Sequence, residues 1–243
     1  MFISNNLLID STKEYLLFIP HAGGSGENFL PWFRYFPEKI GCRYILLPGR
    51  GKRLSEPAFS NMSALISAIT PECLRLCDKP LSIFGHSMGA LIAFELAKAL
   101  QFNHVILKRL FISGCRAPHL SVPIKLSHLA PDELYLQLEK LGGCHDFLKN
   151  NFKYFEYFYP ILINDLALCE SYHYEKGAKL KCPISIFWGM NDEMIAQEKI
   201  YLWKNESNFE TVFHSFPGSH FYLNEYQDLV IKAICRHLEH ESL

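Results

Sequence analysis

The sequence predicts a single α/β domain with a mostly parallel central sheet covered by helices on both faces. Three observations favour this fold class. Short apolar runs alternate with helical patterns along most of the 243-residue chain, a serine between glycines joins a strand to a helix within 83–100, and one long stretch lacks a convincing strand. Strands that alternate with helices form parallel sheets with both faces buried. We therefore expect one domain over 1–243, with a helical insertion at 118–179.

The N-terminal half is expected to supply four strands, each a short apolar run. They are 15–20, 42–48, 81–87 and the segment near 109–113. The helical patterns between them are 28–37, 62–77, where Pro71 is a possible break, and 88–100.

The C-terminal half is expected to supply two more strands, within 182–192 and 209–220, and an amphipathic terminal helix at 223–239. In the insertion, 130–143 is typical of a capped helix, and 150–172 of one or two helices interrupted near Pro160. An insertion at the carboxyl edge of such a sheet overhangs the ligand crevice, so we expect a lid. The alternative is a long crossover that only packs.

The composition excludes several classes of protein. A net charge of −1 and a pI near 6.8 do not favour binding to nucleic acid. The N-terminus lacks the pattern of a signal peptide and no apolar run is long enough to cross a membrane, so we expect a cytoplasmic protein without a membrane partner. The eight cysteines lack metal-like spacing and are expected to be reduced; they are Cys42, Cys73, Cys77, Cys115, Cys144, Cys169, Cys182 and Cys235.

The motif G-x-S-x-G, with Gly85, Ser87 and Gly89, lies between the third expected strand and a helix. In this context it predicts a nucleophile elbow, a strained turn that presents the serine Oγ. Small neighbours let the strand and the helix approach closely. The alternative is a tight turn with an ordinary serine.

A serine hydroxyl needs a base from a loop at the same edge of the sheet. His220 follows the last expected strand, where such a base belongs. His214 lies inside that strand and is expected to be structural. His86 adjoins the serine, but its side chain is expected to point away from the nucleophile.

The base needs a carboxylate to orient it. Asp192 follows the fifth expected strand and is the candidate, with Glu193 as runner-up, whereas Asp165 lies in the insertion and is expected to have a helical or surface role. The chain order Ser87, Asp192, His220 is that of the α/β-hydrolase fold.

Two backbone N–H groups are expected to stabilise the oxyanion. One belongs to Met88, directly after the nucleophile, and the other to Ala22 in the loop "HAGGS". Gly23 and Gly24 would let a carbonyl approach this loop, although it could be a turn without a ligand. The loop lacks the phosphate-binding pattern, and we expect no metal or organic cofactor.

Motifs along nearly the whole chain resemble the type II thioesterases, stand-alone α/β-hydrolases that accompany non-ribosomal peptide and polyketide synthases. The matching segments are "FIPHAGGS" (18–25), "LPGRGKRLSEP" (47–57), "FGHSMGALIAFELA" (84–97), "LGG" (141–143), "FYPILINDLALCESY" (158–172), "CPISIFWGMND" (182–192) and "FPGSHFYL" (216–223). Ser219 and Asn191 depart from the usual family pattern, outside the three predicted catalytic residues.

The resemblance implies hydrolysis of acyl or aminoacyl thioesters on the phosphopantetheine arm of carrier domains, an editing role in antibiotic or siderophore assembly. We expect a monomer. Alternatives are an esterase or a fatty-acyl-carrier-protein release thioesterase of the same fold, or, with less support, a non-catalytic binding protein.

Two further clusters have no fixed role in the sequence. Most of the insertion's aromatic side chains are expected in the lid core, with a minority lining the acyl channel; they are Phe152, Tyr154, Phe155, Tyr157, Phe158 and Tyr159. The basic loop containing Arg50, Lys52 and Arg53 is expected to be a solvated turn, or else a contact to a phosphate or an acidic carrier domain.

Overall fold

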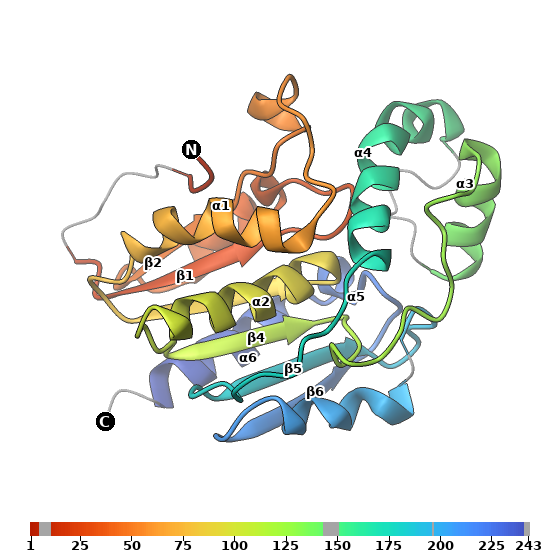
Figure 1. Cartoon of the computed structure of the whole chain (residues 1–243). Coiled ribbons are helices and arrows are strands. Elements are labelled where there is room, and N and C mark those ends of the chain that lie inside the picture. The colour runs from red at the N-terminus through yellow and green to blue at the C-terminus, as the bar shows by residue number, and fades with distance from the viewer. Residues whose placement is uncertain (5–10, 143–150, 196, 241–243) are drawn as a thin grey trace.

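The computed structural model of the chain describes residues 1–4, 11–142, 151–195 and 197–240. A six-stranded sheet with the order β2-β1-β3-β4-β5-β6 forms its centre, and all neighbouring strands are parallel. The strands are β1 (Glu14–Ile19), β2 (Ile40–Tyr44), β3 (Leu81–His86), β4 (Arg109–Ser113), β5 (Ile184–Gly189) and β6 (Thr211–Phe216). This sheet confirms the predicted fold class (Figure 1).

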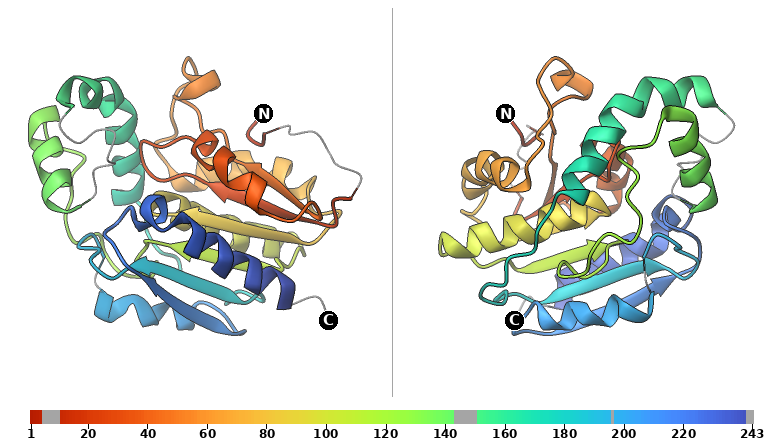
Figure 2. Two further views of the ribbon diagram at one scale, coloured as in Figure 1. Left: turned by 180° about the vertical axis from the view of Figure 1, so that it is seen from behind. Right: turned by 45° about the vertical axis from the view of Figure 1, so that its right-hand side comes forward.

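Helices cover both faces of the sheet, as the two opposite views show (Figures 1 and 2). One face carries α1 (Met62–Leu74), α2 (Met88–Phe102) and the 3-10 helix η3 (Gln197–Asn205), and the other carries the 3-10 helix η1 (Gly26–Tyr35), α5 (Tyr222–Glu225) and α6 (Gln227–His240). Side chains alternate along β1 between the two cores: Leu17 and Ile19 join one, and Leu16 and Phe18 the other.

Several elements differ from the prediction. The segment near 28–37 is 3-10 rather than α-helical, with Pro31 inside it, and β2 begins earlier than expected. Both α1 and α4 (Phe152–Glu170) continue through a proline, Pro71 and Pro160. Each proline is exposed, so the backbone hydrogen bond that it forfeits is lost on the solvent side. The predicted terminal helix is divided at Tyr226.

Two helices, α3 (Pro131–Lys140) and α4, are inserted between β4 and β5 and lie beyond the carboxyl ends of the strands (Figures 1 and 2). They share a small core of their own, formed by Leu126, Leu134, Leu138, Phe155 and Leu162. The expected insertion 118–179 spans this unit, and its residues 143–150, which include Cys144, lie outside the described residues.

The aromatic side chains of the insertion are less buried than the sequence predicted. Phe155 is fully buried, but Phe152, Tyr154 and Tyr157 are exposed. Phe152 still contacts Tyr135 of α3, with 5.6 Å between the ring centroids. The prediction that most of this cluster forms the lid core is therefore wrong.

Candidate active site

Ser87 lies between β3 and α2 in the strained conformation expected of a nucleophile elbow, with φ of 54° and ψ of −117°. Its N–H donates to the carbonyl of Ser113 on the neighbouring strand at 2.8 Å. A Cβ on Gly85 would lie 2.1 Å from the carbonyl oxygen of Gly89, and one on Gly89 would lie 2.2 Å from that of Ile19. Both glycines are therefore required by the close packing of β3, α2 and β1 around the serine.

His220 and Asp192 meet behind the pocket, from the loops that follow β6 and β5. His220 Nδ1 is 2.8 Å from Asp192 Oδ2, and both side chains are buried. The other carboxylate oxygen, Oδ1, accepts the N–H of Met194 at 2.9 Å. Since an ionised carboxylate only accepts hydrogen bonds, the pairing places the ring proton on Nδ1 and leaves Nε2 free to take up a proton.

The two backbone groups predicted for the oxyanion lie beside the serine. Ala22, Met88 and Ser87 line the same pocket. No hydrogen bond within the described part of the chain is donated by the N–H of Ala22 or of Met88. Met88 is the first residue of α2, so its N–H has no partner inside the helix and adds to the positive end of the helix dipole.

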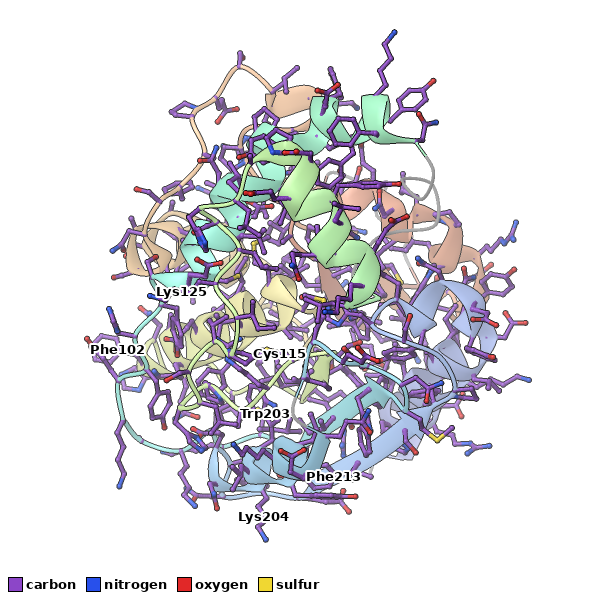
Figure 3. All side chains as sticks on the ribbon, turned by 90° about the vertical axis from the view of Figure 1, so that its right-hand side faces the viewer. Phe102, Cys115, Lys125, Trp203, Lys204 and Phe213 are labelled. Atoms are coloured by element: carbon purple, nitrogen blue, oxygen red, sulfur yellow. The ribbon has the colours of Figure 1, made fainter. Side chains whose placement is uncertain are left out.

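A cavity of about 100 Å³ extends from Ser87 and His220 beneath the inserted helices. Its wall is mainly apolar, formed by Leu91, Val122, Pro123, Ile124, Leu126, Leu141, Leu166, Met194 and Ile195. Figure 3 views the molecule from the side of α3 and α4 and places Cys115, another wall residue, between these helices and Trp203. None of the six aromatic residues expected as possible channel residues belongs to this wall.

Two cysteines in the wall are poor nucleophiles. Burial raises the pKa of Cys115 to about 11, aided by the nearby Asp192 charge and opposed by Arg116. Burial also raises the pKa of Cys169. Both are therefore neutral thiols near pH 7. Among the described residues that line the pocket, Ser87 alone carries a hydroxyl, and His220 lines the same pocket.

The alternative bases and acids have other environments. His214 pairs with His237, with 2.8 Å between their Nε2 atoms, and Glu193 is exposed at the pocket rim. His86 does not line the pocket, but its fully buried ring lies 5.0 Å from that of His220, and its Nδ1 is 2.9 Å from the Ser113 hydroxyl. Burial, followed by the nearby His220 and His21 rings, holds the pKa of His86 well below its usual value.

The structure corrects the roles predicted for Asp165 and Arg50. Asp165 was expected to have a helical or surface role, and Arg50 to lie in a solvated turn or to contact a phosphate or an acidic carrier domain. Instead they form a buried bidentate ion pair with N–O distances of 2.6 and 2.7 Å. In the same loop, Arg53 pairs with Glu56 and stacks on Phe2. The basic loop is therefore largely neutralised within the protein rather than presented to an acidic partner. Whether Arg50 is solvated or buried depends on its contact with Asp165, a residue far away in the chain, and a single sequence does not reveal such a contact.

The described residues contain no group of three or more side chains placed to hold a metal ion. Within the same residues, no helix is both long and apolar enough to cross a bilayer.

Comparison with known proteins agrees with the geometry. The family model described as thioesterase domain matches residues 14–241. The gramicidin S biosynthesis protein GrsT of Aneurinibacillus migulanus is 34% identical over 236 residues, covering 96% of this chain and 92% of that protein.

Solved structures similar to this chain are also thioesterases. The type II thioesterase BorB from the borrelidin biosynthetic cluster superposes with a TM-score of 0.89 at 28% identity, covering 98% of this chain and 97% of that one. The RedJ thioesterase from the prodiginine pathway of Streptomyces coelicolor has a TM-score of 0.87 at 31% identity, covering 93% and 91%. With its α/β-hydrolase fold and a family match over nearly its whole length, the chain belongs to the thioesterase family.

Proposed function

We propose that this protein is a type II thioesterase that hydrolyses acyl and aminoacyl thioesters from the phosphopantetheine arm of carrier domains, and so edits stalled or mischarged non-ribosomal peptide and polyketide synthases. The observation that carries the proposal is the single pocket shared by Ser87 and His220, with Asp192 hydrogen-bonded behind the histidine. The relatives support the substrate class, since they are thioesterases or proteins of such biosynthetic pathways.

In the first half of the reaction, Ser87 Oγ attacks the thioester carbonyl while His220 Nε2 takes the hydroxyl proton. Asp192 holds the imidazole in the required tautomer and stabilises its positive charge. The N–H groups of Ala22 and Met88 donate to the oxyanion. Collapse of this intermediate breaks the C–S bond, and His220 returns its proton to the departing thiolate.

In the second half, water attacks the ester formed on Ser87. His220 removes a proton from the water, and the same two N–H groups bind the second oxyanion. The C–O bond to Ser87 breaks, His220 protonates the serine, and the free acid leaves. Each step uses only groups of this chain, water and the substrate.

The pocket favours short acyl groups. Its small volume and apolar wall suit acetyl, propionyl and similar groups. The helices α3 and α4 belong to the insertion 118–179, which acts as a lid, and the phosphopantetheine arm must pass it to reach Ser87. We place this reaction in the cytoplasm and in a monomer; the seven described cysteines are free thiols, which suits a reducing compartment.

The test is the kcat/KM for one acetyl group presented on a holo-carrier domain, on a pantetheine analogue and as a nitrophenyl ester. We expect the carrier to be the best substrate, because binding energy remote from the thioester can position it for attack. Equal values for the carrier and the analogue would remove carrier recognition from the proposal. Turnover of the oxygen ester alone would favour an esterase, and the absence of all turnover a binding protein.

A further inference from the structure

The loop that supplies the Ala22 N–H is a tight turn with a fixed geometry. The N–H of Gly24 donates to the carbonyl of His21 at 3.0 Å. That carbonyl and the Ala22 N–H belong to the same trans peptide, so they point in opposite directions. Binding the His21 carbonyl inside the turn therefore directs the Ala22 N–H outward, toward the pocket.

The buried ion pair clamps this turn from the side of the lid. Asp165, on α4, accepts the N–H of Gly23 through Oδ2 at 2.8 Å. The same oxygen accepts from Arg50, whose guanidinium also donates to the carbonyl of Gly24 at 3.0 Å. One carboxylate and one guanidinium thus bind the first and the third peptide groups after Ala22, through the N–H of Gly23 and the carbonyl of Gly24.

Packing adds to these hydrogen bonds. Gly23 has a φ of +74°, and a Cβ placed on it would lie 3.3 Å from Cδ1 of Leu162. Leu162 and Asp165 are one helical turn apart, so the same face of α4 rests on the turn. Further along, Leu166, Cys169 and Glu170 of α4 line the pocket.

We infer that Asp165 is a positioning residue for catalysis: seated by Arg50, it fixes the Ala22 N–H in the geometry that receives the oxyanion, and so couples the seating of α4 to the formation of the oxyanion site. This inference rests on the proposed hydrolysis through Ser87. A donor is effective only when it is already oriented where negative charge develops, so a loosened turn loses stabilisation of the transition state rather than binding of the substrate.

The test compares Asp165→Ala, Asp165→Asn and Arg50→Lys with a control variant in a second ion pair, far from the pocket. Glu14 and Lys108 also form a partly buried ion pair, at 2.6 Å, at the amino-terminal ends of β1 and β4. Glu14→Gln therefore removes a similar interaction at the opposite edge of the sheet. For each variant we would measure kcat and KM with nitrophenyl acetate, the Ki of a short alkyl boronic acid, whose serine adduct mimics the oxyanion, and the Tm.

Asp165→Ala is expected to lower kcat about 10- to 100-fold, less than the roughly 10²- to 10³-fold loss of a complete oxyanion donor. KM should change little, and the boronic acid Ki should rise in parallel with the loss of kcat. Asp165→Asn and Arg50→Lys should fall between this variant and the wild type. Arg50→Lys combined with Asp165→Ala should be slower than Asp165→Ala by less than Arg50→Lys alone slows the wild type, because Arg50 acts partly through Asp165 and partly through its own bond to the Gly24 carbonyl. Glu14→Gln should lower the Tm while leaving kcat and Ki unchanged.

A purely structural ion pair would give a different pattern: a lower Tm for the Asp165 and Arg50 variants, with wild-type kcat and Ki. That result would overturn the inference. If Asp165→Ala does not fold, kcat and Ki of Asp165→Asn and Arg50→Lys, compared with their Tm, distinguish the positioning role from the structural one. If the wild-type enzyme hydrolyses nitrophenyl acetate but no carrier thioester, the proposed function is overturned. The role of Asp165 is still tested in that case, because kcat with nitrophenyl acetate and the boronic acid Ki do not depend on a carrier.

Discussion

Asp192 and His220 are separated by 28 positions in the chain, yet Oδ2 of one lies 2.8 Å from Nδ1 of the other, and both side chains are almost wholly excluded from water. The loops after β5 and β6 bring them together, because those strands are parallel neighbours in the sheet. A carboxylate in this position selects the imidazole tautomer that the reaction needs.

Asp192→Asn is expected to lower kcat by about 10³- to 10⁴-fold, because an amide no longer enforces the tautomer or stabilises the imidazolium. Circular dichroism should show an intact fold. The neighbouring carboxylate provides the control, since Glu193→Gln should keep kcat within about 3-fold of the wild type. The reverse ranking of these two variants would make Glu193 the orienting acid.

Gly89→Ala is expected to destabilise the protein by about 3 kcal/mol or more, because the added Cβ would meet the backbone oxygen of Ile19 at 2.2 Å and the strand or helix must move. Gly177→Ala is the matched control. A Cβ there meets nothing within 4 Å, and its effect should be within about 0.5 kcal/mol. Urea denaturation measures both, and similar values for the two would contradict the packing seen at the elbow.

His86 should make the folded state sensitive to acid. Its pKa is depressed in the folded protein from a usual value of 6.5, so the unfolded chain binds a proton first as the pH falls. Stability is therefore complete above about pH 6.5 and declines below it, by at most about 1.4 kcal/mol per pH unit for this proton.

His86→Asn should reduce this decline, measured as the free energy of unfolding at a series of pH values between about 7.5 and 5. Burial also lowers the pKa of His214, so His214→Asn measures its separate contribution and serves as the comparison. An unchanged slope in His86→Asn would show that the buried ring does not titrate on unfolding.

The lid is expected to open unevenly. Among the described residues, α3 contributes Leu134 and Leu138 to the small core of the insertion, whereas the C-terminal part of α4 is held on the turn at Gly23 by Asp165. Hydrogen exchange should therefore be fastest in α3, slower near Asp165 and slowest in α2. Equal protection in α3 and α2 would indicate a fixed wall rather than a gate.

The strands and the elbow could be predicted because their signals are local. Each buried strand is a short apolar run. The glycines around Ser87 indicate that the strand and the helix approach each other closely, as they do in the structure. The positions of His220 and Asp192 followed from the rule that the carboxyl ends of parallel strands meet at one edge. The 3-10 helix η3 carried no comparable pattern and was not predicted.

Asp165 and Arg50 could not be predicted from local signals, since 115 positions separate them. An acidic residue on a helix and an arginine in a glycine-rich loop are solvated in most proteins. Only the packing of α4 on the turn at Gly23 buries both. Phe155 and Leu162, which recur at helical spacing, lie in the core of the insertion, whereas Phe152, Tyr154 and Tyr157 are exposed.

The central claim is that thioester hydrolysis passes through an acyl group on Ser87. Its most direct test is intact-mass and peptide mass spectrometry of the enzyme quenched during turnover of an acetylated holo-carrier, with the Ser87→Ala variant in parallel. We predict an added acetyl group on the peptide containing Ser87 in the wild type, and neither the adduct nor measurable turnover in the folded Ser87→Ala variant. Normal turnover by Ser87→Ala, or an acetyl group trapped on another residue, would contradict it.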